Sequence, residues 1–251
     1  MGVPDRYHLV VANARLRGRG DIVHHIGIRS GRIAAIEPSP LRGDAELDAA
    51  GNLVTPSFVN AHLHLDKVYT LALAGEEPLQ HYTGGQMGQA MTAIELAARG
   101  KDRYEEGWIH QHAHRALLDG LKHGVSHVHA SADTDTRGRL EGVEALLRLR
   151  EEWRGVVDVR VVAFPQEGVL RDPGAEDYVR QALEMDADVV GGIPWIEHTD
   201  RDAQEHVDRM LPWPASSTGT WPCSPTTRAI PGCAPPRCLP RRRSGRGGPG
   251  G

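Results

Sequence analysis

Two histidines separated by one residue, His62 and His64, are the feature of the sequence best suited to chemistry. Residues 57–62 are typical of a strand, and residues i and i+2 of a strand point to the same side of a sheet. The two imidazoles can therefore bind one metal ion, and imidazole suits zinc and iron alike. The spacing alone leaves an alternative open, in which both are simply polar residues at the end of a strand.

A second group of histidines and the cysteines are weaker candidates. His110, His112 and His114 fall in a predicted helix, and no Glu follows His110 as the zinc-protease pattern requires. We therefore expect a solvated helix face. The cysteines lack the Cys-x2-Cys spacing of zinc-dependent nucleotide deaminases. They are Cys223, Cys233 and Cys238.

Three acidic residues follow predicted strands. Asp133 and Asp135 come after the second strand that follows Pro56; they could enter the site, but a polar loop at the end of the strand is the expected placement. Glu197 comes after a later strand, and its exposure stays open.

The elements that must position these residues change character at Pro56. Before it, apolar runs at 7–13, 22–29 and 32–36 predict strands, and Ser30-Gly31 is a hairpin signal, so we expect a small β-layer. After it, predicted strands alternate with predicted helices. The strands are 57–62, 125–130, 156–164 and 188–193, and the helices are 101–123, 138–153, 177–185 and 201–211. This alternation indicates a parallel sheet with covering helices.

The composition excludes several classes of protein. The chain has 251 residues, of which 39% are hydrophobic and 25% charged, so a folded core is expected. No apolar run is long enough for a transmembrane helix, and Asp5, Arg6 and His8 stand where a secretory signal would be apolar. The net charge of −4 argues against nucleic-acid binding. We expect a cytoplasmic protein with no membrane or nucleic-acid partner.

Residues 212–251 differ from the rest of the chain. They hold 9 of the 17 prolines, all three cysteines and no acidic residue. Such a Pro-, Arg- and Gly-rich segment is typical of a disordered tail.

Three stretches carry a resemblance to a known family: residues 52–70, 161–170 and 187–194. In order and spacing they resemble the amidohydrolase superfamily, in its cytosine deaminase-like branch. The resemblance covers about residues 7–211 and implies an α/β fold, the metal-dependent hydrolase (β/α)8 (TIM) barrel with a small N-terminal β-sandwich. It assigns residues 1–56 to the sandwich segment and residues 57–211 to the first four β/α units, about half of the barrel.

The resemblance also implies the site. His62 and His64 match the first two ligands of one divalent metal ion, zinc or iron. Gln166 matches the glutamine that binds the heterocycle, and its amide offers both donor and acceptor. The competing interpretation of Gln166 is a solvated loop residue. The family's remaining catalytic residues would come from strands beyond Leu211, so the catalytic residues of this chain are unknown.

The implied reaction is hydrolysis of a carbon–nitrogen bond in a small nitrogen heterocycle by a metal-activated hydroxide. A homo-oligomer is an open possibility for an intact parent protein. Two alternatives remain: a non-catalytic relative that binds a heterocycle or a partner, and a cyclic-amide hydrolase, which would open the ring without releasing ammonia.

The sequence departs from the family in two places. His129-Ala-Ser131-Ala-Asp133 stands where the branch usually has Arg-Thr-His-Val-Asp. Moreover, only four β/α units precede the tail, which a frameshift after about Leu211 would explain. We therefore expect this chain by itself to have little or no activity.

Overall fold

The computed structural model describes residues 6–70 and 98–212. Within these ranges no helix is both long and apolar enough to cross a bilayer. The cytoplasmic location stays a prediction. Nearly all of the predicted tail, residues 213–251, lies outside the described residues, and so do the three cysteines.

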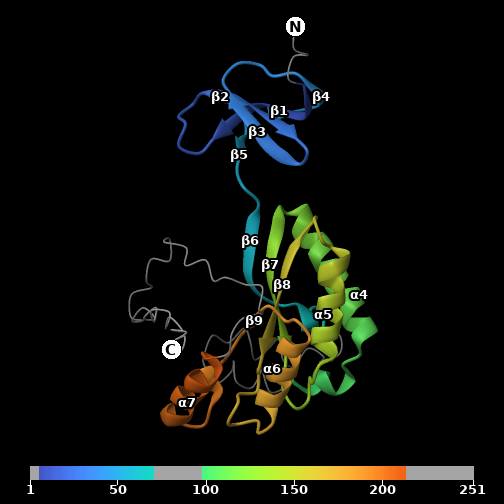
Figure 1. Ribbon diagram of the computed structural model, residues 1–251, viewed down its shortest axis with the longest axis vertical. Helices are drawn as coiled ribbons and strands as arrows, with labels where there is room; N and C mark the ends of the chain where they lie inside the picture. The colour runs from blue at the N-terminus through green and yellow to red at the C-terminus, as the bar shows by residue number, and fades with distance from the viewer. Residues whose placement is uncertain (1–5, 71–97, 213–251) are drawn as a thin grey trace, which may run out of the picture. The chain divides into compact units, whose positions relative to one another are not determined.

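The N-terminal residues form one five-stranded sheet (Figure 1). Its strands are β1 (Tyr7–Leu16), β2 (Val23–Arg29), β3 (Arg32–Glu37), β4 (Gly43–Asp48) and β5 (Leu53–Val54), with the order β3-β2-β1-β4 and β5 also paired to β1. The predicted hairpin is confirmed, because β2 and β3 are antiparallel and both Ser30 and Gly31 have positive φ, as a type I′ turn requires. A sandwich around this sheet stays a prediction.

Strand β4 was not predicted, and its sequence explains why. Gly-Asp-Ala-Glu-Leu-Asp has no apolar run, and most of its side chains are exposed. Strand β4 is fixed by parallel pairing with β1, a contact between segments far apart along the chain that local sequence patterns do not reveal.

A second sheet follows, and its strands are all parallel, as predicted. They are β6 (Phe58–His64), β7 (Val125–Asp133), β8 (Asp158–Phe164) and β9 (Val189–Val190), in the order β6-β7-β8-β9. The helices between and after them are α4 (Glu106–Lys122), α5 (Glu141–Glu152), α6 (Ala175–Glu184) and α7 (Asp200–Met210), with 3-10 turns η1 (Leu65–Lys67), η2 (Arg99–Arg103) and η3 (Pro194–Ile196). The α/β class is therefore confirmed. Closure of this sheet into a barrel stays a prediction.

Two predicted boundaries were wrong. The helix predicted over 101–123 is a 3-10 turn, then an extended residue at Tyr104, then α4. The side chain of Lys101 in that turn is buried, which a solvent-facing helix start would not allow. The strand predicted over 188–193 forms a ladder only at Val189–Val190, although the N–H groups of Asp188 and Gly191 also bond to β8, and η3 begins at Pro194.

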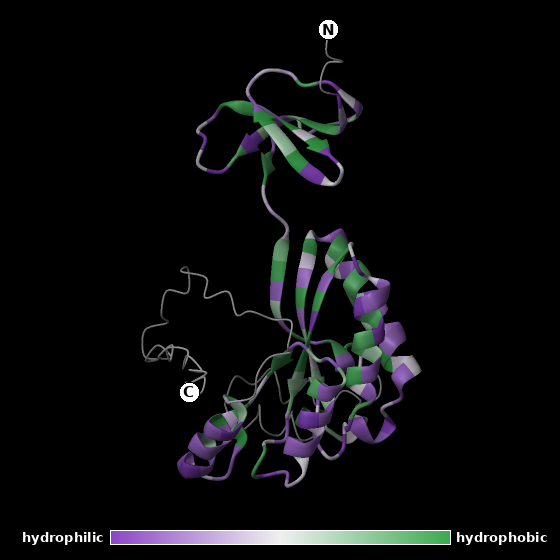
Figure 2. Ribbon diagram, viewed as in Figure 1, coloured by the Kyte–Doolittle hydropathy of each residue, from purple (hydrophilic) through white to green (hydrophobic). Residues whose placement is uncertain are grey.

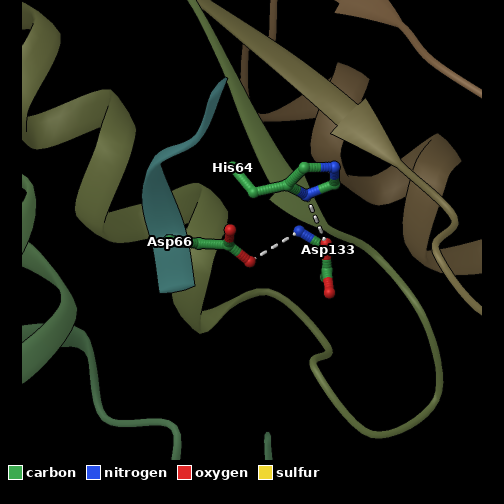
Figure 3. A group of neighbouring side chains, drawn as sticks. All are labelled: His64, Asp66 and Asp133. Atoms are coloured by element: carbon green, nitrogen blue, oxygen red, sulfur yellow. Dashed lines mark hydrogen bonds and ion pairs between the residues drawn. The ribbon is translucent and has the colours of Figure 1, made fainter. Parts of the chain in front are cut away.

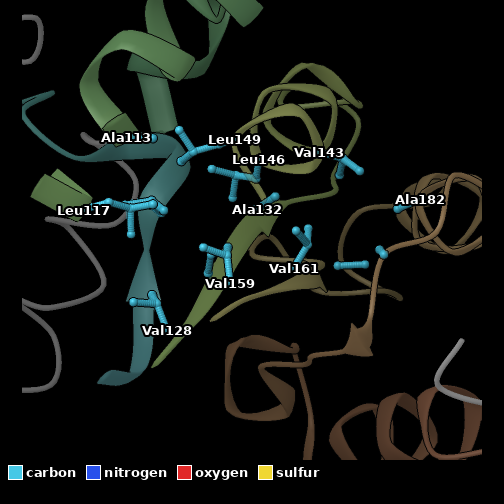
Figure 4. Packing of buried hydrophobic residues seen from close by; sticks show 14 of the residues in the cluster. Ala113, Leu117, Val128, Ala132, Val143, Leu146, Leu149, Val159, Val161 and Ala182 are labelled. Atoms are coloured by element: carbon cyan, nitrogen blue, oxygen red, sulfur yellow. The ribbon is translucent and has the colours of Figure 1, made fainter. Parts of the chain in front are cut away.

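The core lies between one face of the parallel sheet and helices α4, α5 and α6 (Figures 1 and 4). Side chains alternate along a strand, so Val159, Val161 and Ala163 face the helices, whereas Val162 and Phe164 belong to a separate apolar cluster. The helices carry apolar residues on one side and polar residues on the other (Figure 2). Leu146 and Leu149 of α5 are fully buried.

Truncation of a buried leucine tests this core. We expect Leu146→Ala to lower the free energy of unfolding by about 2–5 kcal/mol, because it removes buried methyl groups and leaves a cavity. Leu118→Ala on α4 is the matched control, since Leu118 is 40% exposed, and it should cost less than about 1 kcal/mol. Urea unfolding measures both, and equal losses would contradict the assigned core.

Candidate active site

The polar side chains of the candidate site gather where three parallel strands end. His64 is the last residue of β6, Asp133 is the last residue of β7, and Gln166 follows the end of β8. Turn η1 adds Asp66 and Lys67 directly after β6. In open and closed α/β sheets, the carboxyl ends of the strands are the usual place for a ligand site.

Asp133 is the centre of this cluster. Its side chain is fully buried, and its oxygens contact His64 Nδ1 at 3.0 Å and Lys67 Nζ at 2.8 and 2.9 Å. Lys101 Nζ lies 2.9 Å from Asp133 Oδ2. Burial raises the pKa of the Asp133 carboxyl, but the two ammonium groups and His64 outweigh burial and hold this pKa well below its ordinary value. Asp133 is therefore a buried, ionised carboxylate.

His64 is held in a form that can bind a metal ion. Burial lowers the pKa of His64 despite its bond to Asp133, so the imidazole is neutral near pH 7. Since a carboxylate only accepts hydrogen bonds, Nδ1 carries the proton and donates it to Asp133. The lone pair of Nε2 is then free for a ligand.

His62 lies beside His64, as the strand spacing predicts. The two ring centroids are 5.1 Å apart, and both rings pack edge-on against Phe164. Because His62 is exposed whereas His64 is mostly covered, the pair lies at the border of the cluster. That His62 and His64 bind a metal ion stays a prediction.

A second possible metal-binding group includes Asp66, which the sequence analysis did not single out. Ligand atoms of His64, Asp66 and Asp133 all lie within 4.8 Å of one another (Figure 3). Oδ2 of Asp66 accepts the backbone N–H of Asp133, but buried Oδ1 has no hydrogen-bond partner among the described residues. Burial and the charge of Asp133 raise the pKa of Asp66 to about 7. Its position two residues after the His-x-His pair was the signal available in the sequence.

Lys101 connects Asp133 to two further carboxylates, and sequence analysis missed it. Its side chain is 3% exposed and contacts Asp135 and, at 3.0 Å, Glu167. Burial lowers the pKa of Lys101, but the three carboxylates outweigh burial and raise it. Asp133 is the last residue of β7 and not a loop residue, and Asp135 follows the strand as expected; both side chains are fully buried around this ammonium, which a polar loop did not predict.

Gln166 is buried, not solvated. It is 6% exposed, and its Oε1 accepts a hydrogen bond from Lys67 Nζ at 3.1 Å. Lys67 thus joins Gln166 to Asp133. Binding of a heterocycle by Gln166 stays a prediction.

Glu197, whose exposure the sequence left open, holds the loop that follows Gln166. Its side chain is fully buried and accepts the backbone N–H groups of Val169, Leu170 and Arg171 at 2.6, 3.2 and 2.8 Å. His206 of α7 contacts Glu197 Oε1 at 2.7 Å. Burial raises the pKa of Glu197, but these bonds outweigh burial and hold the pKa below its ordinary value.

The histidines of α4 do not form a metal site. His110 contacts Glu152 at 2.7 Å, and His112 Nδ1 donates to the backbone oxygen of Trp108. His114 packs edge-on against Trp153. The side chain of His110 is less exposed than predicted, at 14%, and none of the three histidines belongs to the possible metal-binding group found among the described residues.

Known proteins similar to this chain include several enzymes. No protein-family model matches. The N-isopropylammelide isopropyl amidohydrolase of Pseudomonas sp. (strain ADP) is 36% identical over 191 residues, which are 74% of this chain and 45% of that protein. The structure of 5-methylcytosine deaminase from Klebsiella pneumoniae with 5-fluorocytosine matches with a TM-score of 0.70 and 30% identity, covering 81% of this chain and 48% of that one. N-isopropylammelide isopropylaminohydrolase from Burkholderia multivorans matches with a TM-score of 0.56 and 27% identity, covering 81% and 49%.

These relatives are deaminases and amidohydrolases, enzymes that hydrolyse carbon–nitrogen bonds. The chain is similar to enzymes of the amidohydrolase superfamily, and these relatives agree with the predicted cytosine deaminase-like branch. The chain spans about half the length of the relatives it matches.

The Glu197 contacts predict a pH-dependent contribution to stability. We expect Glu197→Gln to lower the free energy of unfolding by about 2 kcal/mol near neutral pH, because charge-assisted hydrogen bonds are lost. A carboxyl whose folded pKa is depressed stabilises the fold fully above its ordinary pKa of 4.5 and loses that effect as the pH falls through the folded value. The difference between wild type and variant should therefore shrink below about pH 4.5.

Urea unfolding from about pH 3 to pH 7 measures this difference. Glu184→Gln on the exposed face of α6 is the control and should change little, since Glu184 is 63% exposed. A loss for Glu197→Gln that is the same at every pH would contradict the assigned charge.

Proposed function

We propose that the chain is part of a metal-dependent hydrolase that cleaves a carbon–nitrogen bond of a small nitrogen heterocycle, in the manner of cytosine deaminases. One observation carries the proposal. The predicted metal ligand His64 ends β6, and the predicted ring-binding Gln166 follows β8. The two are linked by hydrogen bonds, from His64 to Asp133, from Lys67 to Asp133 and from Lys67 to Gln166. The heterocycle-processing relatives support the same substrate class.

We also propose the architecture expected from the family. Residues 1–56 would be the N-terminal segment of a β-sandwich, and residues 57–211 the first four β/α units of a (β/α)8 barrel. The parallel order of β6 to β9 supports this, with helices packed on one face. The edge strand β6 supports it too, because Phe58 and Val59 are 62% and 63% exposed there, as expected where further strands would pack.

The residues present fit a divalent metal ion. His64 offers a neutral imidazole with Nε2 free, His62 lies next to it, and Asp66 keeps a buried oxygen without a described partner. Imidazole and carboxylate donors suit zinc and iron. We assign His62 and His64 as the ligands in preference to Asp133, because Asp133 is already bonded to two ammonium groups that would repel a cation.

The protein's own groups would hold the reacting molecules in place. When bound, the metal ion supplies Lewis acidity, which lowers the pKa of water toward neutrality. Asp133 holds the proton of His64 on Nδ1 and fixes the orientation of its ring. Gln166 binds the heterocycle edge, and the Glu197 contacts fix the loop behind it. The groups that transfer protons remain unassigned, and we propose that this chain alone turns over substrate slowly or not at all.

Zinc binding tests the metal assignment. We expect His62→Ala and His64→Ala each to weaken zinc affinity by at least about 10–100-fold, which is the loss expected even for a residue that only orients a ligand. His110→Ala on α4 is the matched control and should leave the affinity unchanged. Isothermal titration calorimetry measures all three. If Asp66→Asn weakened zinc affinity and His62→Ala did not, the metal ion would be assigned to the group of His64, Asp66 and Asp133 instead.

Ligand binding tests the function itself. We expect the zinc-loaded chain to bind 5-fluorocytosine or N-isopropylammelide, and Gln166→Leu to weaken binding by about 10-fold through the loss of one hydrogen bond. Gln204→Leu on the exposed surface of α7 is the control. Calorimetry measures affinity, and assays of ammonia or amine release measure turnover.

The outcomes separate the alternatives. Binding that does not depend on metal would favour the non-catalytic relative. Ring opening without release of ammonia or amine would favour a cyclic-amide hydrolase. Failure to bind any of these heterocycles would contradict the proposed function.

A further inference from the structure

The ammonium group of Lys67 has a matched acceptor for each of its protons. A lysine ammonium has three N–H donors and no acceptor. Nζ of Lys67 lies 2.9 Å from Asp133 Oδ1, 2.8 Å from Asp133 Oδ2 and 3.1 Å from Gln166 Oε1. All three donors are therefore used inside the protein, so Lys67 has none left for a ligand.

This arrangement fixes which end of the Gln166 amide faces which way. The oxygen and nitrogen of a glutamine amide have nearly the same shape, and they are told apart by their hydrogen-bond partners. Because the ammonium group only donates, the atom facing Lys67 must be Oε1. The opposite orientation would place the Nε2 protons against the protons of a cation.

The position of Lys67 is itself firmly set. Its partner Asp133 is fully buried, and Asp133 is bonded in turn to Lys101 and His64. A freely moving lysine could follow a rotating amide, but one held by both carboxylate oxygens of a buried residue cannot do so without losing charge-assisted bonds. The orientation of Gln166 thus depends on the ion network around Asp133.

Nε2 of Gln166 is left as the group that a ligand can use. Among the described residues, no hydrogen bond uses Nε2, and it is not one of the buried polar atoms without a partner. Its two N–H donors are therefore available to an atom that accepts hydrogen bonds. A ligand that instead presents an N–H group at that point would face donor against donor.

We propose that Lys67 is a positioning residue that sets the specificity of the site. It holds Gln166 so that Nε2 donates to a carbonyl oxygen, and thereby selects heterocycles with a carbonyl group there over analogues with an amino group there. The inference rests on the proposed function, because it names the substrate feature that the same site recognises. A ligand that places an N–H donor against Nε2 of Gln166 binds much more weakly, because both donors are then buried without an acceptor.

Two ligands that differ in the group at one ring position test this proposal. 5-Fluorocytosine carries a ring carbonyl, and 2,4-diamino-5-fluoropyrimidine has an amino group in its place and no proton on the neighbouring ring nitrogen. The change at the ring nitrogen is the same for wild type and variant, so the difference between their preferences reports the contact of Gln166 with the carbonyl or amino group. We expect the wild-type, zinc-loaded chain to prefer the carbonyl compound by roughly 10-fold or more. In Lys67→Met the apolar stem is retained but the donor is lost, so the Gln166 amide can rotate by half a turn. The preference for the carbonyl compound should then fall to within about 3-fold.

Control variants distinguish positioning from general damage. Lys67→Arg, which also only donates, should keep most of the preference. Lys122→Met should keep all of it, because Lys122 is 61% exposed and lies at the end of α4. Gln166→Leu should lose the preference whether or not Lys67 is present. An unchanged preference in Lys67→Met would overturn the proposal.

A second measurement needs no ligand. The side-chain amide nitrogen of Gln166 is observed by NMR in wild type, Lys67→Met and Lys122→Met. Since a donor on Oε1 polarises the amide, its resonance should move when Lys67 is replaced and stay when Lys122 is replaced. An unmoved resonance would overturn the orientation. A wild type that binds neither probe would overturn the proposed function together with the selectivity, while the resonance still decides whether the Lys67 bond exists.

Discussion

The buried carboxylate of Asp133 is the group on which the rest of the site depends. An ionised carboxylate without water is stable only when charges and hydrogen bonds replace its hydration. Here Lys67, Lys101 and His64 do so: His64 and Lys67 come from the end of β6 and the adjoining turn η1, and Lys101 comes from η2. The need to neutralise one charge therefore holds two separate segments together and buries the side chain of Lys101 before α4.

The parallel ladder makes this arrangement possible. Asp133 pairs with Phe164, so β7 and β8 end at the same level, and His64 pairs with Ser131, so β6 ends two residues earlier on the same edge of the sheet. A shift of one residue would turn His64 and Asp133 toward the helices and place Leu63 and Ala132 at the ligand side. The apolar contacts of Ala132, Val161 and Leu146 on the helix face oppose such a shift. The packing of the core and the chemistry of the site are thus set by the same register.

Local sequence patterns predicted the features that depend on residues close together along the chain. The β/α alternation, the Ser30-Gly31 hairpin and the shared face of His62 and His64 all follow from periodicity or turn chemistry. The burial of Asp133, Asp135 and Gln166 did not, because their partners Lys67 and Lys101 lie far away along the chain. A polar residue after a strand is usually solvated, and only the folded arrangement shows which lysine reaches it.

The charge balance of the cluster links the ion network to the proposed chemistry. Two ammonium groups, Lys67 and Lys101, face four carboxyl groups, so complete ionisation would leave two negative charges in a buried region. The carboxyl groups are Asp66, Asp133, Asp135 and Glu167. Burial is the main cause that raises the pKa of Asp66 and the pKa of Asp135. The negative charge of Asp133 raises both pKa values further. A divalent cation beside His64 would offset this excess and favour the ionised form of Asp66. On the proposed function, the network that would repel a cation from Asp133 itself would favour one at its edge, where the two histidines of β6 lie.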